Sequence, residues 1–101
     1  MKPAYVFHLN KVFFEMIKNH EKNKEFRPLE KRYAKIPLLK EGDIIRFDLG
    51  YASLKEKEKH IFRKIVYTTT WPLYELPEYV KSVYPEHGWR ELFHVVEFTD
   101  I

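Results

Sequence analysis

Apolar residues recur with two different periods along the chain, and these periods predict both strands and helices. The run from Ala4 to Leu9 is short, apolar and aromatic, which is typical of a buried strand. The segment from Lys11 to Asn19 instead has apolar residues every three or four positions, which predicts an amphipathic helix. The predicted buried face of that helix consists of Phe13, Met16 and Ile17.

The middle of the chain predicts two further strands. Gly42 and Asp43 signal a turn, and apolar residues then alternate with polar ones over residues 44–49. We expect Arg46 and Asp48 on the solvent-exposed face of this strand. Residues 60–70 are rich in β-branched and aromatic side chains, which predicts a longer strand after a charged loop.

Prolines divide the rest of the chain. Residues 28–37 begin and end with proline and carry many charges, which predicts an irregular or single-turn excursion over the surface. After Pro72, apolar residues at helical spacing predict a second helix that ends before Pro85, and residues 92–98 form a last strand. With a short strand after Lys22, this mixed order predicts an α+β fold, a small mixed β-barrel with two main helices at its ends.

Length and composition limit the class of protein. A chain of 101 residues fits one domain, so we expect a single domain over residues 1–101. The absence of cysteine excludes disulfides, thiolate zinc sites and a cysteine nucleophile. No apolar run approaches the roughly 20 residues that cross a bilayer, and the N-terminus lacks the pattern of a signal peptide. We expect a cytoplasmic protein without a membrane partner.

The charge balance is mild, so the placement of charges matters more than their sum. Lys and Arg number 18 against 15 Asp and Glu, and the net charge of +3 weakly favours anionic partners. In the segment EKNKEFR, residues 21–27, a short strand would point Glu25 and Arg27 to one face. The guanidinium could fix the carboxylate as an acceptor, while Lys22 donates to a phosphate, a carbonyl or an oxyanion. A solvated surface strand with ion pairs is the alternative.

The spacing Lys22-x-x-Glu25-x-Arg27 resembles the hallmark of the ASCH domain family, a branch of the PUA-like β-barrels. As in that family, the motif follows an amphipathic helix and precedes a Gly-Asp strand start. The sequence departs from the family at His20, where a glycine is common, so a residue less tolerant of positive φ must make this turn. Further similarities lie at Arg32-Tyr33, at 43–47, at Gly50-Tyr51, at Tyr84-Pro85 and at 95–98.

The resemblance implies a cleft between barrel and helices that takes RNA or a modified nucleoside. Some ASCH proteins remove the acyl group of N4-acetylcytidine with a threonine nucleophile, the motif lysine and a distal glutamate, and others cleave single-stranded RNA. Here Glu25 stands at the threonine's position, so the hydroxyl that this scheme activates is missing. We therefore expect a binding module. The alternative is a nucleoside hydrolase or metal-independent ribonuclease, with Lys22 and Glu25 as catalytic residues and Glu75 or Glu78 as distal acid.

Other side chains complete the predicted site. Trp71 either stacks on a base or packs in the core, and Thr70 either donates a hydroxyl or simply ends a strand. His20 neighbours Lys22 and would serve as a proton carrier. The five histidines lack the spacing of a metal site, so neither a metal nor a cofactor is expected. The predicted ligand contacts are Lys22, Glu25, Arg27, Tyr33, Thr70 and Trp71. A purely structural, partner-binding protein is the third possibility if these charges prove solvated.

Overall fold

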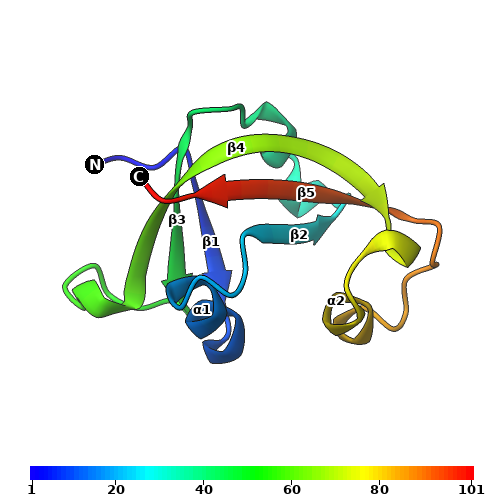
Figure 1. The fold of residues 1–101 in the computed structure, drawn as a ribbon, viewed down its shortest axis with the longest axis horizontal. Helices are drawn as coiled ribbons and strands as arrows, with labels where there is room; N and C mark the ends of the chain where they lie inside the picture. The colour runs from blue at the N-terminus through cyan, green and yellow to red at the C-terminus, as the bar shows by residue number, and fades with distance from the viewer.

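The five strands form one mixed sheet that curls into a half-barrel (Figure 1). The computed structural model describes all residues, 1–101. The strand order is β1-β3-β4-β5-β2, with β1 parallel to β3 and the other neighbours antiparallel. The strands are β1 (Tyr5–Leu9), β2 (Lys24–Pro28), β3 (Ile44–Leu49), β4 (His60–Pro72) and β5 (Leu92–Thr99).

Two helices accompany the sheet, α1 (Lys11–Lys18) and α2 (Glu78–Val83). Both lie on the same side of the sheet in Figure 1. The Asn10 side chain caps α1 by accepting a hydrogen bond from the backbone N–H of Phe13 at 3.0 Å. The predicted α+β fold, with mixed strands curled toward a barrel and two main helices, is confirmed. No helix has the length and apolar character needed to cross a membrane.

The connection after β2 is the irregular excursion that the two prolines predict. It contains two single turns of 3-10 helix, Lys31–Tyr33 and Ile36–Leu38. Ile36 is nevertheless buried, so the second turn covers one opening of the half-barrel. A similar turn, Lys57–Lys59, ends the charged loop, and another, Leu73–Glu75, leads toward α2.

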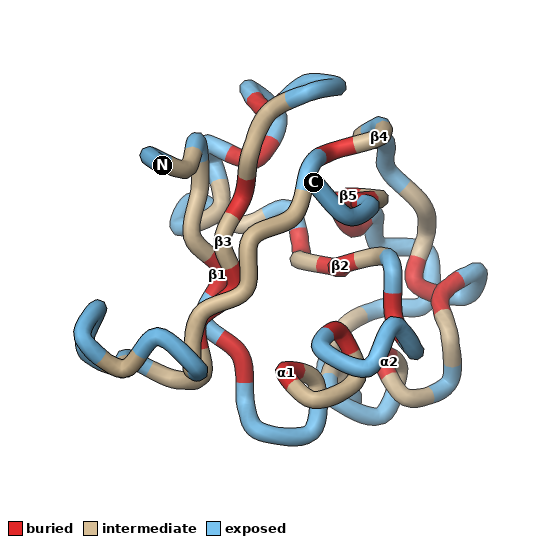
Figure 2. The backbone as a smooth tube through the Cα atoms, turned by 60° about the vertical axis from the view of Figure 1, so that its left-hand side comes forward, coloured by how far each residue is buried: buried red, intermediate tan, exposed pale blue.

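Two apolar clusters hold these elements together. The larger one fills the half-barrel and includes Phe7, Phe47 and Ile65, with Phe14 and Ile17 reaching it from α1. A separate, smaller one packs α2 against the other end of the sheet. Figure 2 shows that buried stretches lie mainly on strands and helices, whereas most connecting loops are exposed. The smaller cluster consists of Phe26, Leu73, Leu76, Val80, Phe93 and Val95.

Two details of the predicted burial are wrong. Helix α1 buries Phe14 and Ile17, while Phe13 and Met16 are only half-buried, because α1 faces both the sheet and a cleft. Asp48 is not on a wet face. It is 2% exposed, and ionic partners on β3 and β4 compensate the loss of its hydration.

The turn between α1 and β2 is made by a residue in the left-handed conformation. His20 is the one residue other than glycine with a positive φ, at 61°. This left-handed conformation places Cβ close to the backbone and is unfavourable for a branched or bulky residue. The His20 side chain is largely exposed, and its one ionic contact is a 3.6 Å approach of Nδ1 to Asp100.

We expect the substitution His20→Gly to stabilise the fold. Relief of the left-handed strain should exceed the entropic cost of glycine, for a net gain of about 0.5–1 kcal/mol in the free energy of unfolding. Urea denaturation measures the change. The matched control is Asn19→Gly, one residue earlier at φ −90°, which should not gain stability. Equal gains in both variants would contradict a strained turn.

Candidate ligand-binding cleft

The half-barrel has an open seam, because β1 and β2 are the two edges of the sheet. The backbone of β2 bonds to β5 on one side only. The N–H of Phe98 donates to the carbonyl of Asn23 at 3.0 Å, which fixes the alternation of the antiparallel ladder. That alternation turns the carbonyl of Lys24 and the N–H of Phe26 toward the seam, where no strand pairs with them.

Three charged side chains satisfy the backbone groups along this seam. Lys22 Nζ donates to the carbonyl of Lys24 at 2.5 Å and to Glu25 Oε1 at 3.2 Å. Glu25 Oε1 also accepts from the N–H of Phe26 at 3.0 Å. Arg27 crosses the seam and donates to the carbonyl of His8 on β1 at 3.3 Å. Glu25 thus lies between two cations, since its Oε2 is 3.4 Å from Arg27.

The cluster is buried, which changes its acid–base properties. The side chain of Lys22 is 2% exposed and that of Glu25 is 7% exposed. Burial lowers the pKa of Lys22, and the neighbouring Glu25 only partly opposes this shift. Burial also lowers the pKa of Arg27, but Glu25, Tyr33 and Tyr84 together outweigh it and the net shift is upward. Arg27 therefore stays charged, whereas Lys22 gives up its proton more readily than an exposed lysine.

Aromatic rings surround the two cations. Lys22 Nζ lies 5.1–5.6 Å from the ring centres of Phe13, Phe26 and Tyr79. These distances fall within the range of a cation–π interaction, which favours the charged amine in a site with little water. Arg27 lies over Phe7 and Tyr33 in the same way, at 5.4 and 5.6 Å.

A cleft of about 170 Å³ opens onto this cluster, between α1, α2 and the seam. Cavities near 150 Å³ accept a single six-membered ring, so the cleft has the capacity for one planar ring. Its floor is polar and its walls are mostly apolar, as in sites for small organic ligands. The cleft is lined by His8, Leu9, Asn10, Phe13, Lys22, Glu25, Phe26, Arg27, Tyr79, Val80, Val83 and Tyr84.

The structure brings three of the six predicted ligand contacts together in the cleft, namely Lys22, Glu25 and Arg27. Tyr33 packs on Arg27 but does not line the cleft. The other two predicted contacts lie elsewhere. Thr70 borders a shallow hollow with His94, which pairs with it across β4 and β5, and Trp71 packs against the smaller apolar cluster.

The residues expected to assist catalysis are also outside the cleft. Glu75 and Glu78 are exposed, and Glu78 pairs with Lys81 at 3.2 Å. His20 points to Asp100 instead of the cleft. The lining contains no serine, threonine or cysteine, and its hydroxyls belong to Tyr79 and Tyr84, whose pKa values are raised by burial. No group of three His, Asp or Glu side chains is placed to hold a metal ion.

Several lining residues were not predicted. Phe13, Tyr79 and Tyr84 carry only a helical or apolar signal in the sequence, which does not distinguish a cleft wall from a core face. His8 belongs to a strand predicted as buried. Its side chain is nevertheless exposed and lines the cleft.

No protein-family model matches the chain, and no curated protein matches it.

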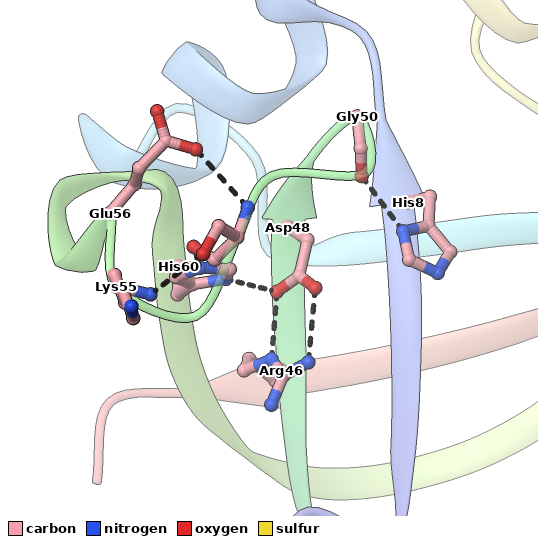
Figure 3. Close-up of polar contacts among 8 residues, drawn as sticks. His8, Arg46, Asp48, Gly50, Lys55, Glu56 and His60 are labelled. Carbon is pink, nitrogen blue, oxygen red and sulfur yellow. Dashed lines mark hydrogen bonds and ion pairs between the residues drawn. The ribbon is translucent and has the colours of Figure 1, made fainter.

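A second polar network holds the loop at residues 50–59 (Figure 3). Arg46 binds both oxygens of Asp48, at 2.8 and 3.1 Å, and His60 Nδ1 lies 2.7 Å from Asp48 Oδ1. His60 Nε2 lies 2.8 Å from the carbonyl of Ser53. A carbonyl and a carboxylate only accept, so a doubly protonated His60 satisfies both contacts. This network was not predicted from the sequence, because His60 lies 12 positions from Asp48 and reaches it only through the pairing of β3 with β4.

The network shifts the pKa values of both ionisable partners. The hydrogen bond to Asp48 is the main cause that raises the pKa of His60, and the carbonyl of Ser53 adds to it. Burial raises the pKa of Asp48, but the hydrogen bonds from Arg46 and His60 outweigh it, and the net pKa lies below its usual range. Both shifts favour the charged form of the group.

We predict that the stabilisation from His60 is lost as pH rises. Its folded-state pKa is above the unfolded value of about 6.5. The contribution is thus complete below that pH and disappears as pH rises through the folded-state pKa. The stabilisation from Asp48 has the opposite dependence on pH and is lost only in acid. Thermal melts of the wild type and His60→Gln should therefore differ most near pH 6, and the difference in Tm should shrink by pH 9. A constant difference would contradict a charged His60.

We expect Glu25 to matter more for stability than its cationic partner Lys22. Glu25→Gln leaves two buried cations without a counter-charge and should lower the free energy of unfolding by about 3–5 kcal/mol. Lys22→Met keeps the length and apolar contacts of the chain, and Glu25 still pairs with Arg27, so about 1–2 kcal/mol should be lost. Urea denaturation of both variants shows which substitution lowers the free energy of unfolding more. The reverse order would show that Glu25 is not the centre of the cluster.

Proposed function

We propose that this protein is a binding module whose cleft receives one nucleobase, either in a nucleoside-like small molecule or in RNA. The observation that carries the proposal is a ring-sized cleft with buried, charged donors and acceptors at its floor. The similarity of Lys22, Glu25 and Arg27 to the ASCH motif, in a half-barrel of mixed strands, supports the same function.

Unused hydrogen-bonding capacity at the cleft floor supports a ligand with both donors and acceptors. Lys22 Nζ has three N–H groups, and two of them are engaged by Lys24 and Glu25. Glu25 Oε2 accepts only from Arg27 among the protein groups and can accept again. Arg27 Nε is buried without a partner, a costly state for a polar atom. The edge of a nucleobase carries adjacent donors and acceptors that suit such a floor.

In this function each residue has a distinct role. Arg27 fixes the carboxylate of Glu25, which accepts from an amino or imino group of the base. Lys22 donates to a base carbonyl, and the rings of Phe13, Tyr79 and Tyr84 enclose the base. The role of Lys22 as donor requires its protonated form, which Glu25 and the surrounding rings favour.

A hydrolase that acts on an acylated nucleoside, or a metal-independent ribonuclease, is the second candidate. The lowered pKa of Lys22 favours it, since such a lysine transfers protons near neutral pH more easily than an exposed one. The cleft lining offers no serine or threonine as nucleophile, so a water molecule would have to attack the substrate. Binding without turnover therefore accounts for more of the site.

We expect cytidine and N4-acetylcytidine to bind in isothermal titration, and Lys22→Met to weaken both by about tenfold or more through loss of a charge-assisted hydrogen bond. The matched control is Lys24→Met, two residues away, whose amine pairs with Glu97 at the surface. It should bind like the wild type.

Three outcomes would count against the proposal. If the wild type binds no nucleoside, the cleft has another ligand. If both lysine variants lose binding equally, Lys22 has no special role, provided that circular dichroism shows both folded. Release of acetate from N4-acetylcytidine, measured in the same samples, would instead establish the hydrolase.

A further inference from the structure

The mouth of the cleft carries a second aromatic feature that the fold does not use for packing. The ring of Tyr51 stacks on His8 with ring centres 4.1 Å apart and an angle of 23° between the planes. His8 lines the cleft, so the stack continues the wall of the cleft outward. Tyr51 is 88% exposed and belongs to neither apolar cluster. Its placement therefore contributes little to the core.

The backbone around Tyr51 fixes its ring in this exposed position. The N–H of Gly50 donates to the carbonyl of Leu9 at 2.8 Å, and the carbonyl of Gly50 accepts from His8 Nδ1 at 2.8 Å (Figure 3). Gly50 has a φ of 58°, the left-handed conformation that glycine adopts without strain. The far end of the same loop is anchored by His60 through the carbonyl of Ser53. An aromatic ring held flat and open to solvent is suited to stacking.

The loop at residues 50–59 carries three lysines and two glutamates, a small excess of positive charge. Lys55 and Lys57 follow Tyr51 on the loop and form no ion pair, whereas Lys59 is paired with Glu56 at 2.8 Å. Lys11, at the start of α1, also has no carboxylate partner. A small positive excess on the loop that carries this exposed ring favours a ligand with a phosphate backbone.

We propose that Tyr51, supported by His8, is a second base-stacking subsite, and that the ligand is a single-stranded RNA whose next base lies on this ring. The inference rests on the proposed function, since it assumes that the first base occupies the cleft. The proposed function allows either a nucleoside or RNA as the ligand. A second stacking subsite favours RNA with at least two linked bases.

Comparing one base with two linked bases tests this subsite. Cytidine and the dinucleotide cytidylyl-cytidine are titrated into the wild type and into Tyr51→Ala. We expect the dinucleotide to bind the wild type about tenfold more tightly than cytidine, as stacking of one more base provides. Tyr51→Ala should abolish that gain and leave cytidine binding unchanged. Tyr51→Phe should keep the gain, because the ring and not the hydroxyl makes the stack.

Trp89→Ala is the matched control. Trp89 is another exposed aromatic residue, in a hollow with Tyr74 and Arg90 away from the cleft, and its loss should change neither affinity. Equal affinity of the wild type for cytidine and dinucleotide would overturn the subsite and leave the proposed function intact. The subsite also fails if Tyr51→Ala weakens both ligands equally, because Tyr51 would then act by positioning His8. Failure of the wild type to bind either ligand would overturn the proposed function together with the subsite.

Discussion

The unpaired seam between β1 and β2 is the constraint on which the structure depends. Strand edges in a protein must be covered, paired or otherwise satisfied, and this half-barrel leaves two of them facing one cleft. Buried charges at the seam replace the missing strand. Lys22 and Glu25 bond to the backbone of β2, and Arg27 reaches across to β1. Glu25 pairs with both cations, and these ion pairs offset the loss of hydration of the buried charges.

The same charges give the cleft its binding chemistry. A side chain that caps a backbone edge is fixed in place, so its remaining donors and acceptors point in defined directions. Lys22 and Glu25 therefore combine a structural role with a capacity for recognition, and removing either affects both. The rings around Lys22 exclude water and strengthen these interactions. Stability and ligand binding must accordingly be measured separately for each variant, with the half-buried Lys24 as the control for Lys22.

The second network, around Asp48 and His60, lies outside the lining of the cleft. It joins β3, β4 and the loop that follows Gly50, and thereby fixes the segment that carries Tyr51. This network explains why Asp48 is buried, although the sequence predicted it on the solvent-exposed face of β3. One ionic partner of Asp48 lies on β3 and the other on β4, so the carboxylate is buried and its charged form is favoured.

The sequence by itself determined the order of strands and helices along the chain and the convergence of Glu25 with Arg27 on one face of a strand. Each depends on local backbone geometry or on residues a few positions apart, which periodicity and turn chemistry express directly. Only the tertiary structure decided that Tyr79 lies over Lys22, that Thr70 and Trp71 lie away from it, and that Asp48 meets His60. These contacts join segments distant in the chain, and the curl of the sheet determines which of them meet.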